Sequence, residues 1–228
     1  MIKLGVIGDI HGNPYALNTA LAEFDRRGID GLLVAGDIIG MGFMGEECVQ
    51  ILQSRNDIVA SVRGNHEEYF TIGLEDRMTD EERAFHIWEH ARLTEASKKY
   101  IRALPVEAEL TIENTHIYMK HYPIEYHTQK NDHQRARELI KKADVSIYAH
   151  DHFRSVVEEY GTIYADFGSL GCPGRLKNIA RAGIITVSAK AAFELLDLEY
   201  DIEPFIRQWD ITDPPARKTV QRMFFGIC

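Results

Sequence analysis

Near the start of the chain, three short apolar runs each lead into a glycine that is followed by a side chain able to bind metal. The runs cover residues 2–7, 31–35 and 57–62, and runs of this length are typical of strands buried on both faces. Helical patterns separate the runs, and a β-α-β-α-β series predicts a parallel sheet with right-handed crossovers. The polar residues at the strand ends are therefore expected to meet around one point.

The segments between these runs carry the signals of amphipathic helices. Asn13 and Pro14 match an N-cap followed by proline at the first helical position, and apolar residues then recur at helical spacing until Gly28 ends the segment. Residues 46–53 predict a second helix. From about 69 to 104 the composition becomes charged and helical, which predicts a helical insertion.

The second half of the chain consists mainly of strand patterns. Short turns at Glu113-Asn114 and at Gly161 each join two of them, which predicts two hairpins. A parallel start followed by hairpins favours the α/β class, with two mixed sheets packed together and helices outside. Residues 1–228 are expected to form a single domain with a helical C-terminal extension over about 204–228. The other predicted elements are a charged helix over 131–142 and strands over 106–112, 115–120, 145–149, 155–160, 162–166, 182–188 and 192–200.

Composition and charge argue against several classes of function. A net charge of −9 disfavours a broad electrostatic contact with nucleic acid, which needs clustered Lys and Arg. It does not exclude a small anionic substrate, because bound divalent cations reverse the local field. The three cysteines lack the spacing of a thiolate metal site, and the N-terminal apolar run is too short to span a membrane. We expect a cytoplasmic protein without a membrane partner.

Two loops each carry a pair of potential metal ligands two residues apart. Asp9 and His11 follow the first apolar run, and His150 and His152 follow the strand predicted over 145–149. Residues two apart in an extended segment point to the same side, so each pair is expected to reach one ion. Either pair alone is more often a polar strand end, and it is the order of several such motifs that carries the prediction.

Three further positions add an oxygen or a nitrogen donor to this set. Asp37 follows the second run, Asn65 offers a neutral amide oxygen after the third, and His121 follows the strand predicted over 115–120. Oxygen and nitrogen donors without thiolate suit Mn²⁺, Fe, Co²⁺, Ni²⁺ or Zn²⁺. The sequence therefore predicts a metal centre that uses no cysteine.

The ordered motifs resemble those of the calcineurin-like metallophosphoesterases, especially the compact phosphodiesterases of bacteria and archaea. That superfamily's series is DxH, GDxxD or GDxxG, GNH[DE], a lone His and GHxH, and all five occur here in that order between Asp9 and His152. The Gly168-Ser169 loop is also similar to that branch.

The sequence departs from the superfamily's pattern in four places. Ala149 replaces the glycine of GHxH, and Gly40 stands where many relatives have Asp. Asp166-Phe167 stand where the compact branch often has Asn-Pro, and His121 lacks the glycine that often follows it.

The resemblance implies a four-layer αββα sandwich that binds two divalent ions, with Mn²⁺ preferred to Fe, Zn²⁺, Ni²⁺ or Co²⁺. The implied catalytic residues are His66 and Asp37, and the implied substrate contacts are Asn65 and His66. His66 would lie beside the ions, where it contacts the scissile phosphate or protonates the leaving oxygen, and Glu67 would orient it. The implied ligands are Asp9, His11, Asp37 and His152 for the first ion, and Asp37 as a bridge with Asn65, His121 and His150 for the second.

The implied activity is hydrolysis of a phosphodiester or nucleotide pyrophosphate bond in a small phosphoester or nucleotide, by attack of a hydroxide shared by the two ions. Two alternatives stay open: a phosphomonoesterase, including a phosphoprotein phosphatase, and a non-catalytic scaffold of the same fold. The apolar tail with Phe224 and Phe225 could pack on its own core or on a second copy, so a homodimer also stays open.

One further pattern lies inside the predicted helical insertion. His86-Ile87-Trp88-Glu89-His90 matches the HxxEH sequence of inverted zinc peptidases, whose histidines lie one turn apart on a helix. It has no evident third ligand, so we interpret it as the face of an amphipathic helix. Tyr69 and Phe70 could stack on a nucleobase or an aromatic leaving group, but packing of the following helix onto the core is the favoured interpretation.

Overall fold

Two five-stranded mixed sheets form the centre of the protein. In sheet A the strand order is β10-β9-β1-β2-β3, with β1, β2 and β3 parallel and β9 antiparallel to both of its neighbours. Its strands are β1 (Ile2–Ile7), β2 (Gly31–Val34), β3 (Ile58–Ser61), β9 (Ile179–Val187) and β10 (Ala192–Glu199). The computed structural model describes residues 1–122, 137–174, 176, 178–188 and 190–226.

Sheet B has the strand order β4-β5-β6-β8-β7. Both predicted hairpins, β4 with β5 and β7 with β8, are present as antiparallel pairs. The short strand β6 lies between them and pairs in parallel with β5 and β8, so this sheet is mixed as well. Its strands are β4 (Glu107–Ile112), β5 (Thr115–Lys120), β6 (Val145–Ile147), β7 (Arg154–Glu159) and β8 (Thr162–Phe167).

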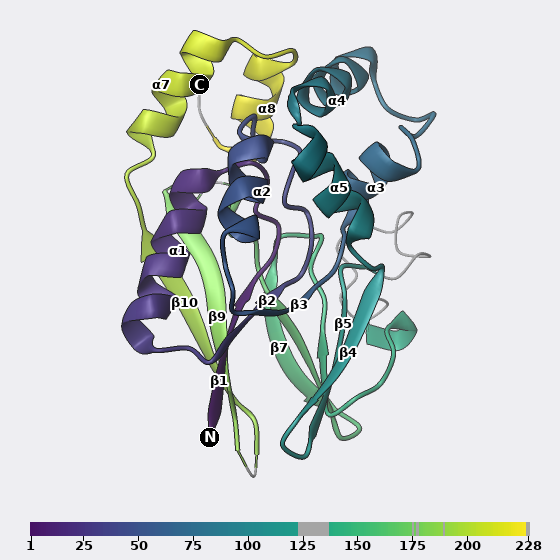
Figure 1. Ribbon diagram of the computed structural model, residues 1–228, viewed down its shortest axis with the longest axis vertical. Coiled ribbons are helices and arrows are strands. Elements are labelled where there is room, and N and C mark those ends of the chain that lie inside the picture. Colours follow the sequence, from purple (N-terminus) through teal and green to yellow (C-terminus); the bar gives the residue numbers. More distant parts are fainter. Residues whose placement is uncertain (123–136, 175, 177, 189, 227–228) are drawn as a thin grey trace.

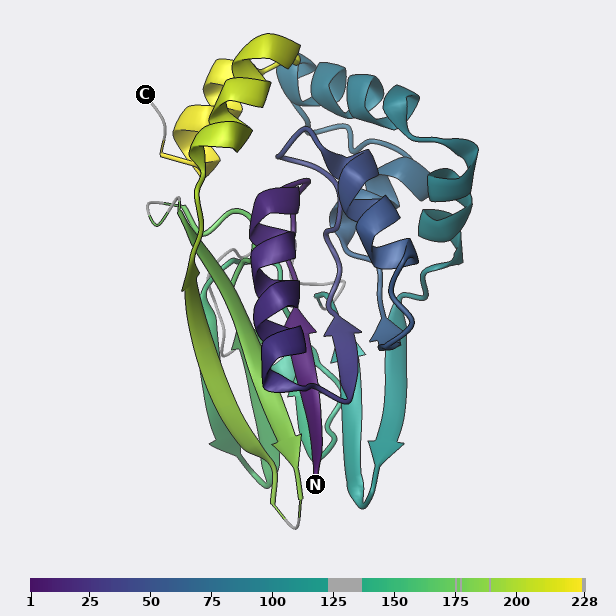
Figure 2. The same ribbon diagram turned by 60° about the vertical axis from the view of Figure 1, so that its left-hand side comes forward.

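The two sheets pack face to face, and helices cover the outer face of sheet A (Figure 1, Figure 2). Leu4 of β1 and Leu33 of β2 belong to one buried apolar core with Ile117 and Ile147 of sheet B. Alternate residues of the same strands, such as Ile7, belong to a second core beneath the helices, as expected for strands covered on both faces. The helices are α1 (Pro14–Arg27), α2 (Gly45–Gln53), α3 (Asn65–Thr71), α4 (Asp80–Arg92), α5 (Glu95–Ala103), α7 (Glu203–Thr212) and α8 (Arg217–Phe224).

The outer face of sheet B carries a smaller apolar cluster. Ile140 packs there against three tyrosines from β5, from β8 and from the residue after β6, and residues 137–139 form a helical turn. Most of the helix predicted over 131–142 falls on residues 123–136, outside the described part of the chain. The predicted fold class is confirmed, since the protein is mixed α/β with two packed mixed sheets and flanking helices.

Local sequence signals place the helix ends close to their predicted positions. α1 begins where the Asn13 side chain accepts a hydrogen bond from a backbone N–H of the first turn at 3.1 Å, and it ends at Gly28, whose φ is 61°. α3 is the main difference, because it begins at Asn65 rather than near residue 69. The Gly-Asn-His-Glu motif therefore enters a helix directly, and its polar side chains occupy the first turn.

The C-terminal helices α7 and α8 lie at one end of the molecule and pack on the chain's own core (Figure 1). Trp209 and Phe225 are fully buried, and Phe205 stacks on Phe43 with ring centroids 5.3 Å apart. Of the two arrangements left open for the apolar tail, Phe225 therefore adopts packing on its own core. Neither α7 nor any other helix of the described residues has the length and apolar composition needed to cross a membrane.

Candidate metal centre

The polar side chains that follow the parallel strands meet at one edge of the two sheets. β1, β2 and β3 are parallel to one another, as are β5 and β6, so their carboxyl ends bring together residues that are far apart in the sequence. All seven predicted ligands lie at these strand ends. They are Asp9 and His11 after β1, Asp37 after β2, Asn65 after β3, His121 after β5, and His150 and His152 after β6.

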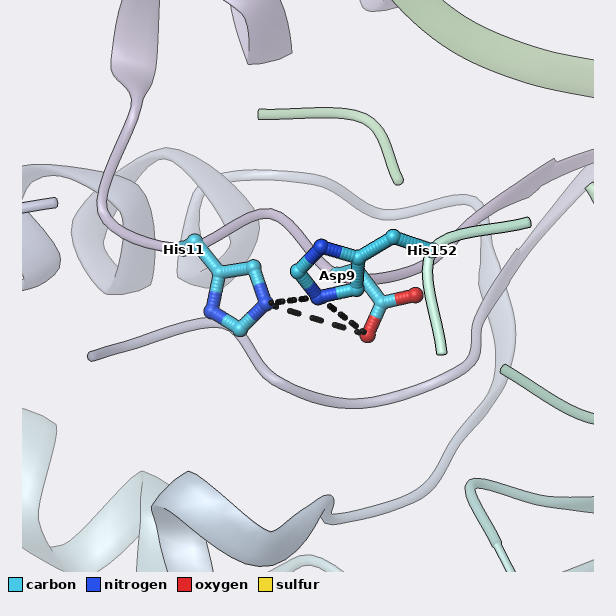
Figure 3. A group of neighbouring side chains, drawn as sticks. All are labelled: Asp9, His11 and His152. Atoms are coloured by element: carbon cyan, nitrogen blue, oxygen red, sulfur yellow. Dashed lines mark hydrogen bonds and ion pairs between the residues drawn. The ribbon is translucent and has the colours of Figure 1, made fainter. Parts of the chain in front are cut away.

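Asp9, His11 and His152 form one group whose metal-binding atoms are turned toward one another (Figure 3). His11 Nε2 lies 2.9 Å from His152 Nε2, and each of these nitrogens lies 3.9 Å from Asp9 Oδ1. Asp9 and His11 are fully buried, whereas His152 lines an open cleft. Three donors therefore converge on one point from two different loops.

Asp37, His121 and His150 form a second group. His121 Nε2 lies 3.1 Å from Asp37 Oδ2, and His150 Nδ1 lies 2.8 Å from the Asn65 amide oxygen. Asp37 Oδ2 also lies 3.8 Å from His11 Nε2, which belongs to the other group. The Asp37 carboxylate thus stands between the two groups and is close to donors of both.

This donor set fits divalent first-row ions. Buried polar atoms are nearly always paired, yet Asp9 Oδ1 is buried and has no hydrogen-bond partner among the described residues. His121 Nε2 is also buried and faces the Asp37 carboxylate, which is itself a predicted ligand. A cation between the loops would satisfy both atoms. Carboxylate oxygen, amide oxygen and imidazole nitrogen are ligands that Mn²⁺, Fe, Co²⁺, Ni²⁺ and Zn²⁺ accept.

Backbone carbonyls orient two of the histidines. His121 Nδ1 donates to the Ala35 carbonyl at 2.6 Å, and His152 Nδ1 donates to the Cys172 carbonyl at 3.0 Å. In the neutral ring each bond assigns the proton to Nδ1, which makes the Nε2 lone pair available to a bound ion. Metal-ligating histidines commonly make this second contact, because it fixes both the tautomer and the ring orientation.

Five of the predicted ligands adopt a left-handed backbone conformation, which is uncommon for residues other than glycine. The expectation that the Asp9–His11 pair and the His150–His152 pair lie in extended segments is therefore wrong. Such a conformation costs on the order of 1–3 kcal/mol per residue and persists where the surrounding structure imposes it. The φ angles are 49° at Asp9, 47° at His11, 51° at Asp37, 92° at His150 and 64° at His152.

Glu67 holds the loop that carries Asp37. Its carboxylate is fully buried and accepts four backbone N–H hydrogen bonds of 2.8–3.1 Å, from Gly64 and from residues 37–39. The sequence suggests that Glu67 orients His66, whereas these bonds fasten the loop after β2 to the start of α3. No sequence pattern indicates the contact, because its distant partners are backbone groups.

His66 lies beside both groups and is almost completely buried. Its ring meets that of His11 edge-on at 5.0 Å, and its backbone N–H donates to Asp37 Oδ1 at 3.0 Å. Burial lowers the pKa of His66, which favours the neutral imidazole. Gly40 packs against this ring, since a Cβ there would lie 1.9 Å from His66 Nδ1. An Asp at position 40 would therefore require the His66 ring to move.

Burial and neighbouring charge set the protonation of the buried ligands. Burial lowers the pKa of His11 and raises the pKa of Asp9, in each case by disfavouring the charged form. Burial opposes the charged forms of Asp37 and His121 too, but their mutual attraction outweighs it. The pKa of Asp37 falls well below its usual value and that of His121 rises to about 10. Asp37 is therefore an anion at the meeting point of the two groups.

A cleft of about 370 Å³ opens beside these residues. Tyr69 lines it, with its ring 5.3 Å from that of His66, so Tyr69 faces the cleft as well as packing within its helix. The cleft is lined by Asp37, Met41, Asn65, His66, Tyr69, Glu75, Arg77, Met78, Glu82, His86, His150, Asp151 and His152.

The Gly168-Ser169 loop supports the site from within the protein. Ser169 is fully buried; its hydroxyl donates to the Asp9 carbonyl at 2.9 Å and accepts from Cys172 N at 2.9 Å. The loop therefore holds the backbone of the Asp9 segment, and the same turn presents the Cys172 carbonyl that orients His152.

Known proteins resemble this chain in sequence and in fold. The calcineurin-like phosphoesterase superfamily domain matches residues 2–190. An uncharacterised protein of Methanocaldococcus jannaschii is 28% identical over 178 residues, which are 75% of this chain and 71% of that protein. A hypothetical protein of Pyrococcus horikoshii has a TM-score of 0.82 over 99% of both chains, at 17% identity. A metallophosphoesterase of Sphaerobacter thermophilus has a TM-score of 0.71 over 99% of both chains, at 20% identity.

The chain belongs to the calcineurin-like phosphoesterase superfamily. The resemblance inferred from the ordered motifs is confirmed, because the family match spans all five of them. The Sphaerobacter metallophosphoesterase and the Pyrococcus protein share this layered arrangement of two mixed sheets, and the match covers nearly the whole of each chain. β10, α7 and α8 lie beyond the matched residues.

Proposed function

We propose that the protein is a phosphoesterase that uses two divalent metal ions to hydrolyse phosphodiester or nucleotide pyrophosphate bonds. The convergence of carboxylate, amide and imidazole donors from five strand ends is the observation that supports this most directly. When bound, such a pair of ions supplies positive charge to the phosphoryl oxygens and lowers the pKa of a coordinated water. The proposed ligands are Asp9, His11, Asp37 and His152 for one ion and Asp37, Asn65, His121 and His150 for the other.

The protein's own residues would orient the substrate around that charge. Asn65 and His66 line the cleft from the first turn of α3, where we propose that they contact the phosphoryl group. His66 would donate a hydrogen bond, or a proton, to the leaving oxygen. Asp37 would act by holding both ions, a role supported by its place between the two groups of donors.

The cleft favours a small phosphoester or nucleotide as substrate. A volume of about 370 Å³ is in the range that accommodates small-molecule ligands. Beyond the proposed ligands the cleft continues along Tyr69 and Met78, which gives room for a second ester group on the phosphorus. The net charge of −9 disfavours a long nucleic acid.

We further propose that residues 1–228 act as one domain. The helical insertion over 69–104 would shape the cleft, since Arg77, Met78 and His86 line it. The extension over 204–228 would pack against the loop after β2, as the contact of Trp209 with Phe43 at 5.4 Å suggests.

The test couples metal content with substrate choice. Protein loaded with Mn²⁺, the ion we prefer for the site, should hydrolyse a bis-aryl phosphate faster than a mono-aryl phosphate. His121→Ala should lose at least one ion per chain by elemental analysis and should lose turnover. His116→Ala is the matched control and should retain both, because His116 lies on β5 as an exposed partner of Glu109.

The alternatives give different results in the same assay. Hydrolysis of the mono-aryl ester alone would identify a phosphomonoesterase, and bound metal without hydrolysis across a panel of mono- and diesters would favour a scaffold. His66→Ala should lower diester turnover by about 10²–10⁴-fold with its metal content retained. Unchanged turnover in that variant would remove His66 from the mechanism.

A further inference from the structure

The buried face of α4 carries three potential metal ligands that belong to neither group of the cleft. His86, Glu89 and His90 are spaced so that all three lie on one side of the helix. His86 is 5% exposed, Glu89 is 2% exposed and His90 is half-buried. One donor atom from each residue lies within 4.8 Å of the donor atoms of the other two. The helix therefore gathers a compact set of two imidazoles and a carboxylate.

Both histidines have an unpaired buried nitrogen. His86 Nδ1 and His90 Nε2 have no hydrogen-bond partner among the described residues, although buried polar atoms normally have one. Burial lowers the pKa of His86 to about 2 and that of His90 to about 4. Both rings are therefore neutral near pH 7, and a neutral imidazole has a lone pair that can bind a metal.

Glu89 is a buried acid that forms no ion pair with Lys or Arg among the described residues. Its carboxylate accepts the Gly40 N–H with both oxygens, at 2.9 and 3.1 Å. Burial raises the pKa of Glu89 to about 8. Buried charges are usually paired or bound to metal, and a cation next to Glu89 would stabilise its ionised form.

We propose that His86, Glu89 and His90 bind one divalent cation of the zinc class, separate from the ions of the cleft. Zn²⁺ binds two imidazole nitrogens and a carboxylate oxygen at about 2.0–2.2 Å, with a water as fourth ligand. Donor atoms on such an ion would be about 3.3 Å apart, so the side chains would close by roughly an ångström on binding.

The two histidines of the HxxEH pattern provide only two ligands, and the proposed site adds a third from the same helix. Glu89, one residue before His90, supplies it, and its second contact reaches the loop after β2 through Gly40. The ring of His86 also lies 5.2 Å from that of His66. An ion here would fix the loop and the ring that flank His66, and it would act as a structural rather than a catalytic metal.

The experiment measures zinc content in the full-length protein. After saturation with Zn²⁺ and removal of free ion, His90→Gln should hold one Zn²⁺ per chain fewer than wild type by elemental analysis. His116→Gln, which alters an exposed histidine on β5, should hold as much as wild type. The difference of one ion is expected whatever the cleft binds, so it is independent of the proposed hydrolase activity.

A second measurement uses the unmodified protein. During titration with Zn²⁺, the side-chain nitrogen NMR signals of His86 and His90 should shift together and saturate at one equivalent beyond the cleft sites. Equal zinc content in His90→Gln and wild type would overturn the proposal. So would histidine signals that stay unmoved at saturating Zn²⁺, even if the variant failed to fold.

Discussion

Replacing Glu67 with Gln should destabilise the protein strongly, although the two side chains have nearly the same shape. In the folded chain each carboxylate oxygen accepts two backbone N–H groups. Oε1 accepts from Ile38 and Ile39, and Oε2 accepts from Asp37 and Gly64. A glutamine has a single acceptor oxygen, so its NH₂ group must face the other pair of donors.

The size of the effect follows from those two unpaired donors. A buried N–H group left without an acceptor costs about 1–3 kcal/mol, which gives about 2–6 kcal/mol for two. Glutamine also removes the cost of burying a charge, a cost that is visible because burial and the Asp37 charge raise the pKa of Glu67 to about 7. We therefore expect a loss of about 2–4 kcal/mol, which a domain of ordinary stability survives.

The assay is urea unfolding at pH 7 in the presence of a chelator, so that metal binding does not contribute. Glu68→Gln is the matched control on the next residue of α3. Glu68 accepts a hydrogen bond from the Tyr122 hydroxyl, which a glutamine oxygen can also accept. Glu68 also lies 3.6 Å from Arg63 Nε, and losing a partly exposed ion pair costs up to about 1 kcal/mol, so the unfolding free energy of Glu68→Gln should fall by no more than that. A Glu67→Gln protein as stable as Glu68→Gln would refute the assignment of Glu67 as the anchor of the Asp37 loop.

Three further outcomes are expected. Gly40→Ala should lower kcat at least about tenfold with metal retained, because the new Cβ would collide with His66. Gly28→Ala, whose Cβ meets open space, should keep the wild-type kcat. Equal kcat values for the two variants would contradict this. Chelation should abolish diester hydrolysis and lower Tm. Mn²⁺ at 100 times its Kd should restore activity and should stabilise the fold by about 2.7 kcal/mol for each ion bound; full activity in chelator would exclude a metal mechanism. Two hydrogen bonds from Arg55 hold the pKa of Asp57 below 3.8, so this pair stabilises the fold above that pH and loses its effect as pH falls through the lower folded pKa. Arg55→Gln, which also removes the Arg55–Asp25 ion pair, should therefore cost about 1 kcal/mol at pH 7 in urea unfolding and progressively less as the pH falls below 3.8. A cost independent of pH would contradict the assignment.

Much of the fold could be predicted because local and long-range signals agree. Short apolar runs ending in glycine marked β1 and β2, and the Asn13 cap with Gly28 marked both ends of α1. The strand predicted over 145–149 is present as β6, but its parallel pairing with β5 and β8 could not be predicted, because those two strands are distant from each other in sequence.

In the candidate site too, some residues could be identified from the sequence and others only from the fold. The seven proposed ligands could be named because their residue types and their order are visible in the sequence. The four bonds of Glu67 could not, since backbone amides have no sequence signature. Glu89 was missed as a ligand for a related reason, because its burial depends on how α4 packs near Gly40.

At the strand ends, the left-handed backbone conformation lowers the stability of the fold at positions whose side chains are the proposed metal ligands. At Asp9, His11 and Asp37, glycine would relieve conformational energy and abolish a ligand in the same step. Selection for thermodynamic stability alone would therefore remove the metal ligands at these positions first. A descendant freed from turnover should accumulate glycine or asparagine at these three positions while its sheets stay intact.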